Sequence, residues 1–235
     1  MKVVHVLSGK GGVGKTTVAV GLAEYLGTRC KTGLLDADLH GPDVLSLLGV
    51  SEKLGVKDKR IQPVRKGNLS LISFGGLIED DQAVIWRGPL KFKAIYQLIN
   101  DTDWGDIEYL IVDHPPGTGD ELISAVQLLK EHQMGGLLVS TPQRLSLADL
   151  GRAVDFCRKM DLPVIGVVEN MTGDVFGSGH VKRFCEEHDI PYLCDIPLDP
   201  SVPRITDSVL DNVSPIVRER ISCVGESVIR WFGSD

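Results

Sequence analysis

The feature that most constrains this chain is a glycine-rich loop, Gly9–Thr16 (GKGGVGKT), set between an apolar run and a helical pattern. Residues Lys2–Ser8 (KVVHVLS) are apolar and β-branched, which predicts a buried parallel strand. Residues Thr16–Leu26 carry apolar side chains at helical spacing. A strand, a glycine loop and a helix in this order are the context in which G-x-x-x-x-G-K-[ST] indicates a phosphate-binding loop rather than a solvated turn.

The residue types of the loop suit a nucleoside triphosphate. Glycines allow backbone N–H groups to converge on an anion, and the helix N-terminus adds unpaired N–H groups. Lys15 is expected at the β- and γ-phosphates, and the Thr16 hydroxyl is expected to bind Mg²⁺. The predicted nucleotide-binding residues of the loop are Gly9, Lys10, Gly11, Gly12, Val13, Gly14, Lys15, Thr16 and Thr17.

Composition limits the other possibilities. A chain of 235 residues with 43% hydrophobic content can form one large α/β domain over residues 1–235. The net charge of −7 gives no general case for nucleic acid, so phosphate binding must come from the local loop. No apolar run approaches the roughly 20 residues that span a bilayer, and the chain starts directly in a strand, so neither a membrane segment nor a signal peptide is expected. Five irregularly spaced cysteines suggest reduced thiols in a cytoplasmic protein.

Strand-like and helical patterns alternate along the chain. This alternation predicts a doubly wound, mostly parallel sheet with helices on both faces. Residues Ser51–Asn68 are the most polar stretch and are expected to form a surface excursion. The last helical segment, Ile216–Phe232, has an apolar stripe that suits either the core or a membrane surface, with the core favoured. Further strands are expected at Thr32–Leu35, Leu69–Phe74, Tyr109–Val112, Gly136–Ser140, Val164–Val168 and Tyr192–Ile196, and further helices at Pro42–Leu48, Leu90–Asn100, Glu121–Glu131, Leu145–Met160 and His180–His188.

Three aspartates follow predicted strands, where ligands of such sheets bind. Asp113 ends the run Tyr-Leu-Ile-Val and is expected to hold Mg²⁺ through water, although strand-end aspartates also serve as caps and turn residues. Asp36 and Asp38 share one side of the strand if it continues. Asp36 is expected to help position the Mg²⁺ waters, and Asp38 is expected to orient the attacking water; turn formation before Gly41 is the alternative for Asp38.

Asn170 follows the predicted strand Val164–Val168, and its amide can pair with a purine edge. Guanine-specific enzymes of related architecture usually carry an aspartate three positions later, where this chain has Gly173. Adenine is therefore favoured.

These residues resemble the deviant Walker A triphosphatases, the class of the ParA and MinD proteins and the nitrogenase iron protein. Within that class the chain is most similar to the Mrp/Nbp35 family of iron–sulfur cluster carriers. The matching motifs span nearly the whole chain in order: SGKGGVGKTT, DADLHGPD (Asp36–Asp43), WRGP (Trp86–Pro89), DHPPGTGDE (Asp113–Glu121), STPQ (Ser140–Gln143), VENM (Val168–Met171) and IPLDPSV (Ile196–Val202).

The resemblance implies a slow, dimer- or partner-dependent ATP hydrolase with ATP and Mg²⁺ as cofactors. It also implies that Lys10 reaches the phosphates of a second subunit in a homodimer, while Lys15 and Thr16 serve the nucleotide of their own subunit. Asp38 would assist hydrolysis, and Asp113 would serve Mg²⁺ and the second switch segment. The implied process is iron–sulfur cluster or metal-cofactor assembly.

The chain departs from the family at two places. In the motif that begins at Asp113, the family usually has threonine directly after the aspartate, whereas this chain has His114. Cluster carriers also usually have a C-x-x-C pair soon after the ENM segment, and none is present here; the nearest cysteines, Cys185 and Cys194, are expected to be ordinary thiols. The sequence therefore assigns no cluster site and suggests a separate metal- or cluster-binding partner. A ParA/MinD-like spatial organiser and a small-molecule ligase are the alternatives.

Overall fold

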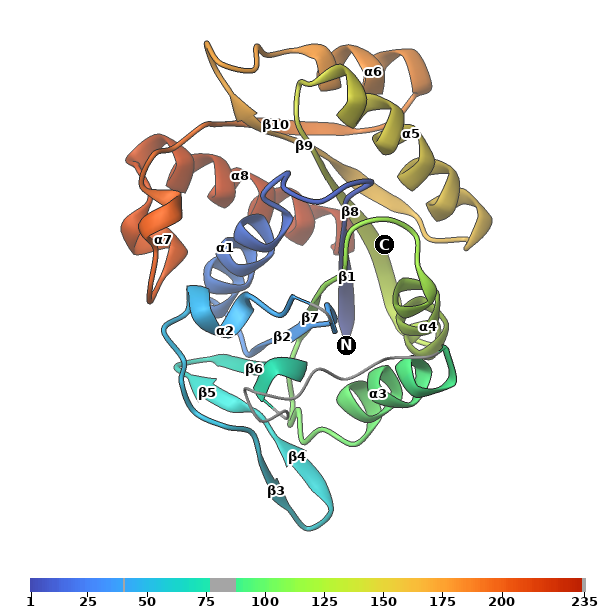
Figure 1. The fold of residues 1–235 in the computed structure, drawn as a ribbon, viewed down its shortest axis with the longest axis vertical. Helices are drawn as coiled ribbons and strands as arrows, with labels where there is room; N and C mark the ends of the chain where they lie inside the picture. Colours follow the sequence, from blue (N-terminus) through green and yellow to red (C-terminus); the bar gives the residue numbers. More distant parts are fainter. Residues whose placement is uncertain (40, 77–87, 234–235) are drawn as a thin grey trace.

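The centre of the protein is one large sheet. The computed structural model describes residues 1–39, 41–76 and 88–233 (Figure 1). Within them, eight strands pair in the order β10-β9-β8-β1-β7-β2-β6-β5. All neighbours are parallel except β5, which runs antiparallel to β6. The strands are β1 (Lys2–Leu7), β2 (Thr32–Asp36), β5 (Val64–Lys66), β6 (Leu69–Ser73), β7 (Tyr109–Asp113), β8 (Gln133–Ser140), β9 (Val164–Thr172) and β10 (Tyr192–Pro197).

Helices cover both faces of this sheet, which confirms the predicted doubly wound α/β fold (Figure 1). One face packs against α1 (Lys15–Gly27), α2 (Val44–Leu47), α7 (Val209–Asn212) and α8 (Pro215–Phe232). The other face packs against α3 (Gly88–Asn100), α4 (Asp120–Leu129), α5 (Arg144–Lys159) and α6 (His180–His188). The structure also contains two short 3₁₀ turns, η1 (Phe74–Gly76) and η2 (Val202–Arg204).

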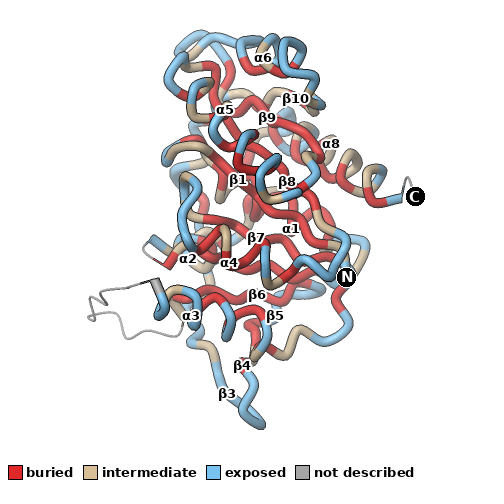
Figure 2. Tube along the Cα trace, turned by 90° about the vertical axis from the view of Figure 1, so that its right-hand side faces the viewer, coloured by how far each residue is buried: buried red, intermediate tan, exposed pale blue. Residues whose placement is uncertain are grey.

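The central strand β1 shows why the predicted strands read as continuous apolar runs. Val4 and Val6 belong to the core under α1 and α8, whereas Val3 and Leu7 belong to the cores on the opposite face. Because successive side chains of a strand point to opposite faces, a strand covered on both sides needs apolar residues at nearly every position. Figure 2 shows the result, a band of buried backbone through the middle of the molecule.

The apolar stripe of α8 lies in the core. Val217, Ile221, Val224 and Val228 are each at most 2% exposed, and the helix packs on α1 and β10. The core interpretation of this stripe is therefore confirmed. In the described part of the chain, no helix combines the length and the hydrophobicity that crossing a membrane requires.

The structure differs from two of the expectations. Residues Ser51–Asn68 include a largely exposed hairpin of β3 (Gly55–Lys57) and β4 (Arg60–Gln62), as a surface excursion would, but they also contain β5 of the large sheet. Each of these three-residue strands has only one apolar side chain, so they leave little apolar periodicity to detect. In addition, β9 does not end at Val168 but continues to Thr172, which places Asn170 inside a strand.

Candidate functional site

The predicted phosphate loop forms the turn between β1 and α1, at the carboxyl end of the sheet. It lines a cavity of about 470 Å³ together with Ser8, Asp38, Gly41, Asp43, Ser46, Leu47, Pro116 and Ile205. Gly12 and Gly14 have φ of 76° and 79°, a conformation that side chains with a Cβ rarely adopt. Gly9 is needed for a different reason, because an added Cβ would lie 2.2 Å from the carbonyl oxygen of Asp149.

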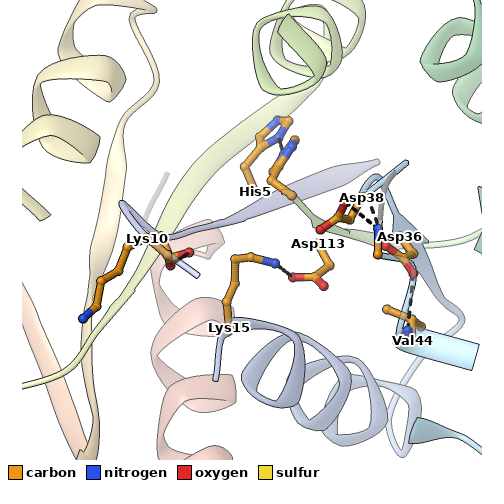
Figure 3. Close-up of polar contacts among 10 residues, drawn as sticks. His5, Lys10, Lys15, Asp36, Asp38, Val44 and Asp113 are labelled. Carbon is orange, nitrogen blue, oxygen red and sulfur yellow. Dashed lines mark hydrogen bonds and ion pairs between the residues drawn. The ribbon is translucent and has the colours of Figure 1, made fainter. Parts of the chain in front are cut away.

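Lys15 and Asp113 form a buried ion pair at the floor of the cavity. Lys15 Nζ lies 2.5 Å from Asp113 Oδ1, and both side chains are at most 8% exposed (Figure 3). Burial raises the pKa of the Asp113 carboxyl above its usual range, and the Lys15 ammonium and Thr16 hydroxyl beside it offset part of that rise. The pair places an ammonium and a carboxylate next to each other at the N-terminus of α1.

Asp36 and Asp38 follow one strand but occupy different environments. Asp38 is among the residues that line the cavity. Asp36 is 1% exposed and is not among them; it accepts hydrogen bonds from Asp38 N (3.1 Å), Ser73 Oγ (3.0 Å) and Val44 N (3.3 Å). Burial and the nearby Asp113 raise the pKa of Asp36 to about 8. In this structure Asp36 therefore shapes the loop that presents Asp38, and its predicted part in the metal site stays a prediction.

Lys10 lies at the rim of the cavity and points away from Lys15 (Figure 3). Its Nζ donates a hydrogen bond of 3.0 Å to Oε1 of Gln143, in the connection between β8 and α5. The two loop lysines are thus directed apart: Lys15 towards Asp113, and Lys10 towards Gln143. Gln143 belongs to the STPQ motif, but no pattern in the sequence indicates that it contacts Lys10.

Asn170 contacts the phosphate loop itself. Its Nδ2 donates a 2.8 Å hydrogen bond to the carbonyl oxygen of Val13, and the amide lies directly against Gly14. Beside it is a second, mainly apolar pocket of about 110 Å³, which is lined by Val18, Asn170, Met171, Ile196, Leu198, Asp199, Val202, Pro203, Val217 and Ile221 among others. An apolar slot with one amide next to a phosphate site suits a purine ring.

The oxygen donors around the main cavity fit Mg²⁺. This ion usually binds one or two protein oxygens and completes its octahedron with water and nucleotide phosphates. Thr16 and Asp38 line the cavity, and Asp113 is paired with the cavity residue Lys15. No group of three or more histidine, cysteine or acidic residues that could hold a metal ion occurs among the described residues.

A buried histidine pair next to this site was not predicted from the sequence. His5 Nδ1 and His114 Nε2 are 2.8 Å apart, within hydrogen-bond distance, and both rings are fully buried. Burial lowers the pKa of His5 to about 3, and burial together with His5 and Lys15 lowers that of His114 well below its usual value. The second nitrogens, His5 Nε2 and His114 Nδ1, have no hydrogen-bond partner in the part of the chain that the structure describes. His5 carries no local signal because it sits in an otherwise apolar strand.

The first two cysteines that follow the ENM segment do not lie together. Cys185 packs in the core under α5 and α6, whereas Cys194 packs in the core under α1 and α8, on the opposite face of the sheet. Both thiols are buried, and burial raises the pKa of each to about 12. These residues therefore do not form a thiolate site within one chain.

Two predicted motifs extend beyond the described residues. Trp86 and Arg87 of WRGP and His40 of DADLHGPD lie outside them, while Gly88 and Pro89 begin α3.

The fold and the cavity define a P-loop NTPase with a doubly wound sheet. A family model described as "ParA: NUBPL iron-transfer P-loop NTPase" matches residues 1–223, and the chain belongs to this family. It is 39% identical over 210 residues to an iron–sulfur cluster carrier protein of Rickettsia bellii, covering 89% of this chain and 65% of the relative. It is 41% identical over 219 residues to the human cytosolic Fe–S cluster assembly factor NUBP2, covering 86% of this chain and 81% of that protein. The chain therefore spans less than two thirds of the bacterial carrier.

Solved structures agree with this assignment. A nucleotide-binding protein from Archaeoglobus fulgidus in complex with ADP has a TM-score of 0.73 and 29% identity, with 98% of this chain and 90% of that chain covered. The cell-division ATPase MinD of Pyrococcus furiosus has a TM-score of 0.77 at 22% identity, with 98% and 99% covered. The second similarity shows the common fold alone.

Proposed function

We propose that this chain is a Mg²⁺-dependent ATPase that dimerises with nucleotide and acts in the assembly or carriage of iron–sulfur clusters in the cytoplasm. The observation that carries the proposal is the phosphate-loop cavity, in which a buried Lys15–Asp113 pair and Asp38 meet at the N-terminus of α1. The family assignment supports the biological process, since relatives are named as cluster carriers and assembly factors.

The residues of the cavity supply the chemistry of phosphoryl transfer, which depends on positioning and on stabilising negative charge. Lys15 would leave Asp113 and bind the β- and γ-phosphates. Its ammonium would then exchange one anionic partner, the carboxylate, for another, the phosphates. Thr16, with Asp113 through water, would hold Mg²⁺, which neutralises phosphate charge when bound. Asp38 would orient the attacking water from the cavity wall, and Asn170 would lie beside the adenine in the apolar pocket.

Lys10 supports a homodimer. Its ammonium is bound only to the neutral amide of Gln143 among the described residues, and it points away from Lys15. A lysine held at a cavity rim in this way can bind the phosphates of a second copy, which makes hydrolysis conditional on assembly. The same arrangement would account for a slow basal rate in the monomer.

In this proposal the cluster is cargo that a separate protein helps to bind. This chain lacks a cysteine pair after Asn170, and Cys185 and Cys194 lie on opposite faces of the sheet. A bridging cluster normally needs four thiolates, which these buried cysteines do not offer. We therefore propose that a metal- or cluster-binding partner supplies the missing ligands.

The test combines nucleotide and metal measurements. Calorimetric titration with Mg²⁺-ATP and Mg²⁺-GTP should show ATP binding that Lys15→Ala abolishes and that the exposed control Lys159→Ala retains. Anaerobic purification, alone and with a cluster-bearing protein, followed by iron and sulfide analysis, tests the cargo. Failure of ATP to bind would refute the ATPase. Stable iron and sulfide in the isolated chain that survive Cys185→Ser and Cys194→Ser together would refute the need for a partner.

A further inference from the structure

An ion pair between the partly buried Lys91 and the buried Glu121 joins α3 to α4. Lys91 Nζ lies 2.6 Å from Glu121 Oε1, and the side chains are 20% and 5% exposed. Separating a charged pair that is largely shielded from water costs free energy, because each charge would be left without its partner. Glu121 also has an interaction besides the ion pair with Lys91. The pair therefore fixes the relative position of the two helices more firmly than an exposed pair could.

Glu121 is the end point of the segment that leads away from Asp113. Near its start, this segment is tied to β1 by hydrogen bonds from His114 N to Val6 O (3.3 Å) and from Gly117 N to Ser8 O (2.9 Å). At its end, the Glu121 carboxylate lies against the backbone of Gly119, where an added Cβ would be 3.0 Å from Oε2. The segment thus runs from the phosphate site to the Lys91–Glu121 pair.

The helix on the other side of the pair presents an unusual surface. Leu90, Phe92 and Tyr96 are each between 44% and 49% exposed, while Ile95 and Leu98 of the same helix are fully buried. Phe92 and Tyr96 contact each other across one helical turn, with ring centroids 6.4 Å apart. A shift of α3 would therefore change the apolar surface that the protein presents.

We propose that Glu121 and Lys91 are positioning residues that couple the nucleotide cavity to α3. Nucleotide moves the segment between Asp113 and Asp120, Glu121 moves with it, and the Lys91–Glu121 ion pair carries α3 along. Gly117, with φ of 89°, and Gly119 give the segment the backbone freedom that such a movement needs. This inference rests on the proposed ATPase function and adds a route by which nucleotide state reaches a surface outside the phosphate site.

The test is hydrogen–deuterium exchange of residues 88–100 in the nucleotide-free protein and with Mg²⁺ and a non-hydrolysable ATP analogue. In the wild type, exchange in α3 should differ at least about twofold between the two states. Glu121→Gln should abolish this difference while its affinity for the analogue stays within about threefold. Lys91→Arg should retain the difference, because it keeps the charge, and so should the exposed control Lys93→Met.

Steady-state hydrolysis gives a second readout, because a merely structural role of Glu121 would not change kcat selectively. Glu121→Gln should lower kcat with little change in KM, and circular dichroism should match that of the wild type. An unchanged α3 response in both Glu121→Gln and Lys91→Met would overturn the coupling, as would a wild-type protein that binds the analogue without any change in α3. Absence of binding by the wild type would instead overturn the proposed function, and this inference with it.

Discussion

The buried His5–His114 pair predicts a steep loss of stability below pH 6.5. Both imidazoles are held neutral in the folded protein, because burial lowers the pKa of His5 to about 3 and that of His114 well below its usual value of 6.5. In the unfolded chain both return to about 6.5 and take up protons as the pH falls. Since the unfolded state then binds more protons than the folded state, acid favours unfolding.

The magnitude for His5 follows from its pKa in the folded and in the unfolded chain. Above pH 6.5 neither state binds these protons, so the pair has no effect on stability there. Each pH unit below 6.5 costs about 1.4 kcal/mol per histidine until the folded pKa is reached. At pH 5.0 this amounts to about 2 kcal/mol for His5, and His114 adds a loss of the same sign. Asp36, whose pKa in the folded protein is raised to about 8, gains stability over the same pH range, so the histidine contribution is read as the difference between the wild type and the histidine variants.

The assay is urea unfolding of the nucleotide-free protein between pH 5.0 and 7.5, followed by circular dichroism. His114→Thr should recover part of the histidine-dependent loss, and the double variant His5→Phe/His114→Thr should recover nearly all of it. The exposed His132→Gln is the matched control and should behave as the wild type does. If the double variant keeps the wild-type slope within about 0.5 kcal/mol, the two rings are not held neutral and the reasoning fails.

Three substitutions at the cavity test its geometry more directly. Gly14→Ala should weaken ATP binding more than tenfold, because the Cβ would lie 2.2 Å from Asn170 Nδ2 at a φ of 79°; calorimetry showing near wild-type affinity would contradict this. Lys10→Ala should bind ATP nearly normally but lose hydrolysis and nucleotide-dependent dimerisation, as measured by phosphate release and light scattering, and equal hydrolysis would argue against a role in the second subunit. Asp38→Asn should lower kcat at least about tenfold at unchanged ATP affinity, and a wild-type rate would exclude it as the residue that orients water.

The phosphate loop could be predicted because its physical requirements are local. A buried strand, glycines that permit positive φ and a helix N-terminus are consecutive in the chain, so Gly12, Gly14 and Lys15 were found at the cavity as expected. The same holds for α6, whose bounds at His180–His188 match the predicted helix. The boundary of β9 was wrong because nothing in its local pattern shows that Asn170 is buried against the phosphate loop.

The alternation of strands and helices, the phosphate loop and the family could all be inferred from the amino-acid sequence, since each is written in consecutive residues. Only the tertiary structure showed which distant residues are in contact. These pairs are Lys10 with Gln143, Asp36 with Ser73, His5 with His114, and Lys91 with Glu121. Folding also separates Cys185 from Cys194 by placing them on opposite faces of the sheet. The physical reason is that these relations depend on which strands are neighbours and which face each side chain occupies, and neither is fixed by local periodicity.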